Sequence, residues 1–135
     1  MRSNYEERVG VSITTHGVQF EYEPWLCAYY SSVRGSTCAD CGGNQILKLR
    51  WYTPDFVLPN GLIIEAKGKL TGANRTKILD ILDTSEYITR DNFRLLFMED
   101  NKYGSAGRRY SDWAEQYGIV YHVSRIGEVP ESWLT

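Results

Sequence analysis

Residues 52–68 of this 135-residue chain read YTPDFVLPNGLIIEAKG, and this segment limits the possible folds more than any other. Two short apolar runs flank Pro59-Asn60-Gly61, a pattern that predicts a β-hairpin. Three charged residues stand at the open end of the hairpin: Asp55, Glu65 and Lys67. Burying a charge beside apolar strands costs free energy unless the charge binds something. The segment therefore indicates a binding or catalytic site.

The register of the hairpin decides whether these charges share a face. A two-residue turn at 60–61 would place Asp55 opposite Ala66 and on the other face from Glu65, because side chains alternate along a strand. A three-residue loop, with proline first and a left-handed glycine last, places Asp55 opposite Glu65. We favour this loop, which brings Asp55, Glu65 and Lys67 onto one face. Apolar residues on both faces predict an interior position in a sheet.

Two carboxylates on neighbouring strands can hold a hard divalent cation such as magnesium through their oxygens. A lysine beside them can stabilise the charge that develops on a phosphate, or orient or deprotonate an attacking water. The alternative is a surface ion pair of Lys67 with Asp55 or Glu65. The apolar neighbours of both carboxylates favour the functional interpretation.

Length and composition predict one globular domain over residues 1–135, because 42% of the residues are apolar and four are Trp. No apolar run reaches the length of a membrane span, so we expect no membrane partner. Three Cys, an odd number, argue against a secreted disulfide framework and favour a cytoplasmic location. A net charge of −2 argues that nucleic acid is contacted through a local patch.

The order of elements predicts an α/β fold in which helices flank a mixed β-sheet. A Cys-containing insertion loop is expected at about residues 34–45. The other expected elements are a helix from a Ser3 cap to about 16, strands at 18–23, 25–33 and 46–50, a helix from an Asn74 cap to about 83, an interior strand at 93–98, a basic loop at 102–109, a helix at 110–117, a strand at 119–123 and a helical turn at 130–134.

The hairpin fits the Pro-Asp…Glu-x-Lys signature of restriction-endonuclease-like nucleases. More of the chain resembles the phage endonuclease I family, whose members resolve four-way Holliday junctions. The segments that carry this resemblance are SxxExxV from Ser3, FEYExW from Phe20, YTPDF from Tyr52, LPNG at 58–61, ExKG from Glu65, YGI from Tyr117 and PxxW from Pro130. The resemblance covers nearly the whole chain.

The resemblance implies that Asp55 and Glu65 bind Mg²⁺ or Mn²⁺, with two cations in each active site. It also implies that Lys67 is the active-site lysine and that Glu6 supplies the remaining carboxylate. Glu6 has a second interpretation, because a glutamate three residues after Ser3 can complete a capping box. Glu7 is the competing carboxylate, and motif position favours Glu6.

The resemblance further implies a restriction-endonuclease-like fold in an intertwined, strand-swapped homodimer. Each active site would take its helix glutamate from one chain and its hairpin residues from the other. The implied activity is metal-dependent, structure-selective cleavage of four-way junctions and branched DNA by paired symmetric nicks, which leaves a 5′-phosphate and a 3′-hydroxyl. The location would be the host cytoplasm if the chain is phage-encoded. Two alternatives stay open: a nuclease of this fold that nicks ordinary duplex in replication, restriction or transposition, and a non-catalytic junction-binding module.

Two further sites are expected outside the hairpin. Family members carry basic terminal extensions, and this chain is expected to bind DNA through local basic residues instead: Lys69, Arg75, Lys77, Arg108 and Arg109. Arg108 and Arg109 are equally consistent with solvated surface charges. Cys38-Ala39-Asp40-Cys41 is half of a zinc knuckle, which two copies of the chain, or Cys27 and His16, could complete. The alternative is a pair of unliganded thiols.

Overall fold

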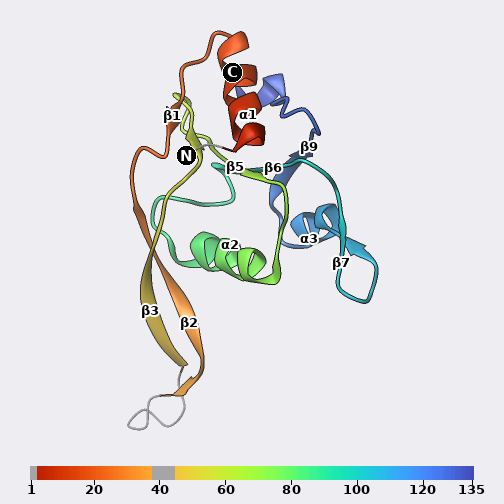
Figure 1. Ribbon diagram of the computed structural model, residues 1–135. Coiled ribbons are helices and arrows are strands. Elements are labelled where there is room, and N and C mark those ends of the chain that lie inside the picture. The colour runs from red at the N-terminus through yellow and green to blue at the C-terminus, as the bar shows by residue number, and fades with distance from the viewer. Residues whose placement is uncertain (1–2, 38–44) are drawn as a thin grey trace.

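The computed structural model describes residues 3–37 and 45–135 of the chain. Its elements, labelled in Figure 1 where there is room, are α1 (Asn4–Thr15), β1 (Glu21–Tyr22), β2 (Cys27–Thr37), β3 (Gln45–Tyr52), β4 (Phe56–Val57), β5 (Ile63–Lys67), α2 (Gly72–Thr84), β6 (Phe93–Phe97), β7 (Lys102–Tyr103), β8 (Arg108–Arg109), α3 (Tyr110–Gln116), β9 (Val120–Val123) and a final 3₁₀ turn (Glu131–Trp133).

A mixed sheet of five strands, in the order β1-β4-β5-β6-β9, forms the centre of the fold. β1, β4 and β5 pair antiparallel, whereas β5, β6 and β9 pair parallel. The two parallel pairs are joined by α2 and α3, since parallel strands need a crossover connection. The expected α/β fold with a mixed sheet is confirmed.

The hairpin adopts the three-residue loop. Phe56 pairs with Ile64, and the N–H of Leu58 donates to the carbonyl of Leu62 at 2.9 Å. Gly61 closes the loop by donating to the carbonyl of Leu58 at 3.0 Å, with a φ of 90° that favours glycine. The same register, extended by one residue, sets Asp55 opposite Glu65.

Both faces of the sheet are covered. On one face, Ile63, Leu95 and Phe97 belong to a core shared with α2 and α3. On the other, Phe56 and Ile64 belong to a second core shared with α1 and the C-terminal segment. The hairpin therefore lies between two cores, as expected from its double apolar pattern.

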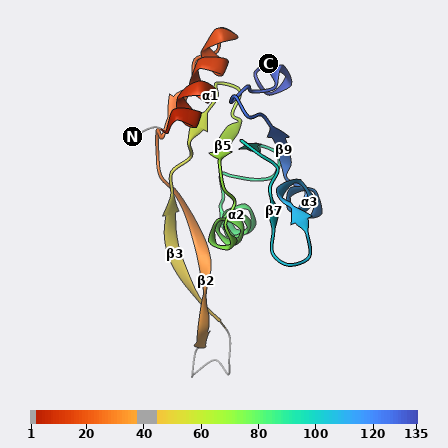
Figure 2. The same ribbon diagram turned by 45° about the vertical axis from the view of Figure 1, so that its right-hand side comes forward.

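A long two-stranded ribbon, β2–β3, projects from the sheet away from α1 (Figures 1 and 2). One of its faces packs on α2 through Cys27, Tyr29 and Tyr52, which are buried. The backbone pairing continues to Thr37 opposite Gln45. The loop expected at 34–45 is therefore wrong at its start, because β2 extends to Thr37. The register of the β2–β3 pairing shifts between Ser32, opposite Leu47, and Thr37, opposite Gln45.

Three smaller expectations also need correction. The strand expected at 18–23 is reduced to Glu21–Tyr22. The basic loop at 102–109 contains a small antiparallel pair, β7–β8. Helix α2 is capped by Thr71 rather than Asn74, because the Thr71 hydroxyl accepts the N–H of Asn74 at 3.1 Å.

Candidate active site

Helix α1 presents Glu6 from its first turn. Ser3 caps the helix by accepting the N–H of Glu6, and its hydroxyl donates to Glu6 Oε1, both at 3.2 Å. The hydroxyl of Tyr22 donates to Glu6 Oε2 at 2.5 Å. Glu7 is exposed and lies outside this arrangement. Glu6 thus takes part in the cap and also faces the hairpin, so the two interpretations of this residue are compatible.

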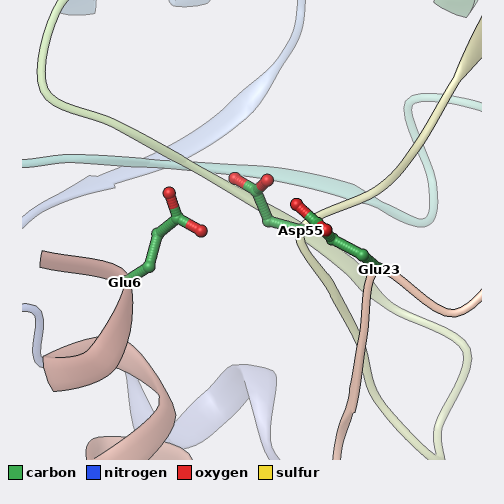
Figure 3. A group of neighbouring side chains, drawn as sticks. All are labelled: Glu6, Glu23 and Asp55. Carbon is green, nitrogen blue, oxygen red and sulfur yellow. The ribbon is translucent and has the colours of Figure 1, made fainter. Parts of the chain in front are cut away.

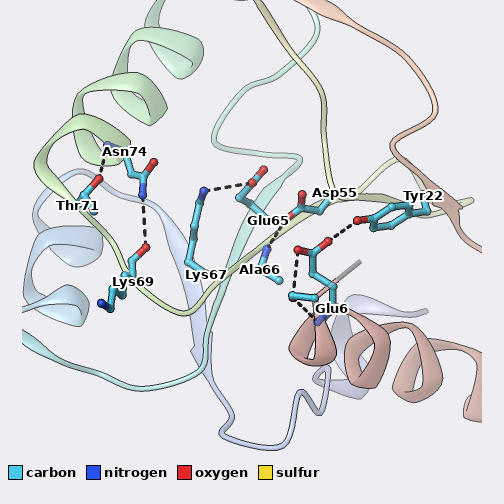
Figure 4. Close-up of polar contacts among 10 residues, drawn as sticks. Glu6, Tyr22, Asp55, Glu65, Ala66, Lys67, Lys69, Thr71 and Asn74 are labelled. Carbon is cyan, nitrogen blue, oxygen red and sulfur yellow. Dashed lines mark hydrogen bonds and ion pairs between the residues drawn. The ribbon is translucent and has the colours of Figure 1, made fainter. Parts of the chain in front are cut away.

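Asp55 is held at the point where the β4–β5 pairing ends. β4 begins at Phe56, so its last backbone pair is with Ile64. Asp55 Oδ2 accepts the next free N–H of β5, that of Ala66, at 3.0 Å. This bond fixes the carboxylate beside β5, where Figure 4 shows it next to Glu65.

Glu65 is the buried charged residue of the described part of the chain, with 5% of its surface exposed. Lys67 Nζ lies 3.6 Å from Glu65 Oε1. Glu65 Oε2 is fully buried and has no hydrogen-bond partner among the described residues. A buried carboxylate oxygen without a partner is costly, which indicates that it binds a ligand.

Burial disfavours the ionised form of both hairpin carboxyls. It raises the pKa of Asp55 to about 6, although the N–H of Ala66 acts in the opposite direction. It raises the pKa of Glu65 to about 7, although the positive charges of Lys67 and Lys77 lower it. Raised carboxyl pKa values in one place are typical of functional sites.

Glu23 is the residue that the sequence did not single out. Oxygens of Glu6, Glu23 and Asp55 lie within 4.8 Å of one another, and Figure 3 shows the three carboxylates turned toward one another. Glu23 directly follows β1, and its N–H donates to the carbonyl of Asp55 at 3.1 Å. Glu23 belongs to the FEYExW segment, which also contains Glu21. The alternation of side chains along a strand puts both glutamates on one face, so it does not indicate that Glu23 is the one that turns toward the hairpin.

These donors fit a hard divalent cation. They are carboxylate oxygens, the ligands that Mg²⁺ and Mn²⁺ prefer. They come from three separate segments of the chain, and one buried oxygen of the hairpin pair has no hydrogen-bond partner in the part of the chain that the structure describes. Asp55, Glu65 and Glu6 would hold the cation, and Lys67 would lie beside it.

Comparison with known proteins matches the phage endonuclease I family model to residues 1–135. The chain belongs to the phage endonuclease I family. Endodeoxyribonuclease 1 of Enterobacteria phage T3 is 30% identical over 122 residues, which cover 89% of this chain and 69% of that protein. Endonuclease I of Escherichia phage T7 is 28% identical over 135 residues, which cover 98% and 77% respectively. No helix in the described ranges is long and apolar enough to cross a membrane.

The basic residues expected to contact DNA differ in their exposure and in the contacts that they make within the protein. Lys69 and Lys77 are exposed, and Lys77 Nζ lies 5.3 Å from the centre of the Tyr52 ring. Arg75 stacks on Tyr103 at 4.1 Å and donates to the carbonyl of Leu70. DNA binding by these three stays a prediction.

Arg108 and Arg109 have structural partners. Arg108 donates to the carbonyl of Asp112, and Arg109 to the carbonyl of Asp100 at 2.8 Å. The N–H of Arg109 also donates to the Asp112 carboxylate at the start of α3. These contacts give both arginines a local role in joining β8 to α3, and any contact with DNA stays a prediction.

The expected zinc ligands Cys38 and Cys41 lie outside the described residues. Cys27 is buried with its Sγ 3.1 Å from Ser85 Oγ. His16 caps the end of α1, and its Nδ1 lies 2.9 Å from the carbonyl of Ser12. Within the described ranges, Cys27 and His16 belong to no group of three close metal-binding side chains.

The raised carboxyl pKa values make the stability of the cation-free protein depend on pH. Since both folded pKa values exceed the unfolded ones, the folded chain holds more protons between about pH 4 and pH 7. The contribution of Asp55 and Glu65 to the free energy of unfolding therefore falls as the pH rises through this window. We expect Asp55→Asn and Glu65→Gln each to reduce that fall, measured by urea unfolding in EDTA at pH 5 and pH 7.5.

The exposed neighbour Glu7 provides the control for this measurement. Glu7→Gln removes one negative charge from α1 without touching the hairpin. If all three variants show the wild-type pH dependence, burial of the hairpin carboxyls is not the cause of it.

Proposed function

We propose that this chain is a metal-dependent, structure-selective DNA endonuclease that resolves four-way junctions and other branched DNA by paired symmetric nicks. The observation that carries the proposal is the position of Asp55 next to a buried Glu65, with Lys67 and Glu6 close by. The second oxygen of Glu65 has no hydrogen-bond partner within residues 3–37 and 45–135. Membership of the phage endonuclease I family and the endonuclease names of its T3 and T7 relatives support it.

The reaction is hydrolysis of a phosphodiester. The oxygen of a water attacks phosphorus, the bond to the 3′ oxygen breaks, and that oxygen leaves with a proton, which yields a 5′-phosphate and a 3′-hydroxyl. Bound Mg²⁺ or Mn²⁺ would stabilise the charge on the phosphate and leaving oxygens and lower the pKa of the water.

The protein side chains contribute a positive charge near the phosphate and hold the carboxylates in position. Lys67, whose side chain is 24% exposed, is close enough to Glu65 to be oriented by it and open enough to meet water or a phosphate oxygen. Tyr22 and the helix cap hold Glu6 in place from both sides. Asp55 is fixed by the backbone of β5. Such a preorganised polar site favours the transition state without reorganising during the reaction.

A homodimer suits a four-way junction, because two related active sites can place two symmetric nicks. The outer face of the β2–β3 ribbon supports this assembly. Tyr30 pairs with Leu49, and Ala28 with Trp51, on the face opposite α2. Tyr30, Leu49 and Trp51 are 46%, 47% and 59% exposed in the single chain. An apolar face of this kind fits a second copy of the ribbon.

Exchange of α1 between the subunits stays a prediction. In the structure, Glu6 and Asp55 of the same chain have carboxylate oxygens within 4.8 Å of one another. The helix is joined to the hairpin through the whole β2–β3 ribbon. An exchanged helix would therefore rebuild the same contacts on the partner.

The first test uses a four-way junction and a matched duplex with Mg²⁺. We expect symmetric nicks in the junction and far slower cutting of the duplex. Lys67→Ala should lower the cleavage rate by at least about 100-fold, because it removes a preorganised charge from the transition state. Binding of the junction, measured by gel shift in Ca²⁺, should persist, because most phosphate contacts lie elsewhere.

Other outcomes favour the alternatives. Equal cutting of junction and duplex would support a nuclease for ordinary duplex DNA. Junction binding without cleavage, unchanged in Asp55→Ala, would support a non-catalytic module.

The second test concerns the dimer. Leu49→Lys places a charge on the apolar ribbon face, so we expect it to convert a wild-type dimer to a monomer in sedimentation velocity, while the circular-dichroism spectrum shows that the chain stays folded. Val11→Lys is the matched control, because Val11 is a 66% exposed apolar residue on α1. A wild-type monomer, or equal dissociation by both variants, would contradict this interface.

A further inference from the structure

Glu23 stands outside the nuclease signature, yet its backbone is built into the site. It directly follows β1, and its N–H continues the β1–β4 pairing by bonding to the carbonyl of Asp55. Its φ of 47° is the one positive value at a non-glycine residue among those described. This conformation turns the chain, and the side chain faces Asp55 (Figure 3).

The three carboxylates lie close together without a direct ion pair, and the positive charge that acts on Asp55 from nearby is that of Lys67. Their oxygens lie within 4.8 Å of one another. Within the described ranges, no lysine or arginine forms an ion pair with Glu6, Glu23 or Asp55. Tyr22 donates to Glu6 and Ala66 donates to Asp55, so these two carboxylates are held rather than free to move apart.

A second and independent observation also points to a ligand. The side chain of Glu65 is 7% exposed, and its Oε2 has no hydrogen-bond partner among the described residues. Figure 4 shows Asp55 with Glu65 on one side and Glu6 on the other. Asp55 therefore lies between the buried Glu65 oxygen and the Glu6–Glu23 pair, in a position to contact two cations at once.

We propose that Glu23 is a ligand of a second divalent cation, which it shares with Glu6 and Asp55, next to the cation held by Asp55 and Glu65. The inference rests on the proposed nuclease function and adds a carboxylate to its site. Glu23 is exposed, so a cation at this position keeps open places for water and for a phosphate oxygen. Mg²⁺ favours such sites, because it retains several waters when it binds carboxylates.

The test counts Mn²⁺ ions bound to the full chain by isothermal titration calorimetry, with free Mn²⁺ followed by electron paramagnetic resonance. We expect two ions on the wild type. Glu23→Gln should weaken one of them by at least about tenfold and leave the other unchanged, since charge count sets the affinity of such sites. Glu7→Gln, which removes one negative charge from exposed α1 surface, should bind two ions normally.

Thermal unfolding checks that the variant is folded. In EDTA, Glu23→Gln should melt no lower than the wild type, because it removes repulsion among like charges. Its rise in melting temperature on adding Mn²⁺ should be smaller, since only binding to the folded state stabilises it. Glu23→Asp separates ligation from charge, because it keeps the charge and withdraws the oxygens by one methylene. Loss of the second ion in this variant supports ligation.

Two failures are distinguishable. If the wild type binds two ions and cuts junctions while Glu23→Gln binds both ions with unchanged affinity, Glu23 is a solvated surface charge and only this inference fails. If the wild type binds no divalent cation and does not cut DNA, the proposed function fails.

Discussion

The position of Asp55 opposite Glu65 is the constraint on which the rest of the site depends. The Pro59-Asn60-Gly61 loop sets it, and Gly61 makes that loop possible by adopting a φ of 90°. A register shifted by one residue would turn Asp55 to the opposite face and also exchange the residues that enter the two cores. The same loop therefore determines the packing of the sheet and the geometry of the acidic site.

The site holds carboxylates in surroundings that disfavour their ionised forms. Burial raises the pKa values of Asp55 and Glu65. Asp55 is restrained by the N–H of Ala66, and Glu6 by Tyr22. Held carboxylates of this kind weaken the cation-free protein and favour a bound divalent cation, because the cation binds the ionised forms. The proposed nuclease chemistry depends on that preference for a cation. The exposed side chains of Tyr30, Leu49 and Trp51 form the surface through which we propose that a second subunit, with its own active site, binds.

Local patterns were sufficient to predict the parts of the fold that depend on neighbouring residues. They predict the hairpin register, the Ser3 cap and an interior strand at 93–98, which the structure has at Phe93–Phe97, since turn chemistry and apolar runs act over short distances. They failed where tertiary contacts decide. Glu23 enters the site through backbone pairing with Asp55 and a left-handed turn, neither of which alternation indicates. Arg108 and Arg109 bond to the nearby residues Asp112 and Asp100, and these contacts depend on how the chain folds around β7, β8 and α3, which the residue types alone do not indicate.

The most direct measurement of the central claim is anomalous diffraction at the manganese edge from crystals grown in Mn²⁺. If Asp55 and Glu65 hold the cation, we expect a peak about 2.0–2.6 Å from oxygens of both residues, the range of cation–oxygen bonds in proteins. Such a peak would explain why the buried Glu65 oxygen has no hydrogen-bond partner among the residues that the structure describes. The absence of a peak at this pair, in crystals of protein that cuts junction DNA with Mn²⁺, would contradict the claim that the hairpin carboxylates form the metal site.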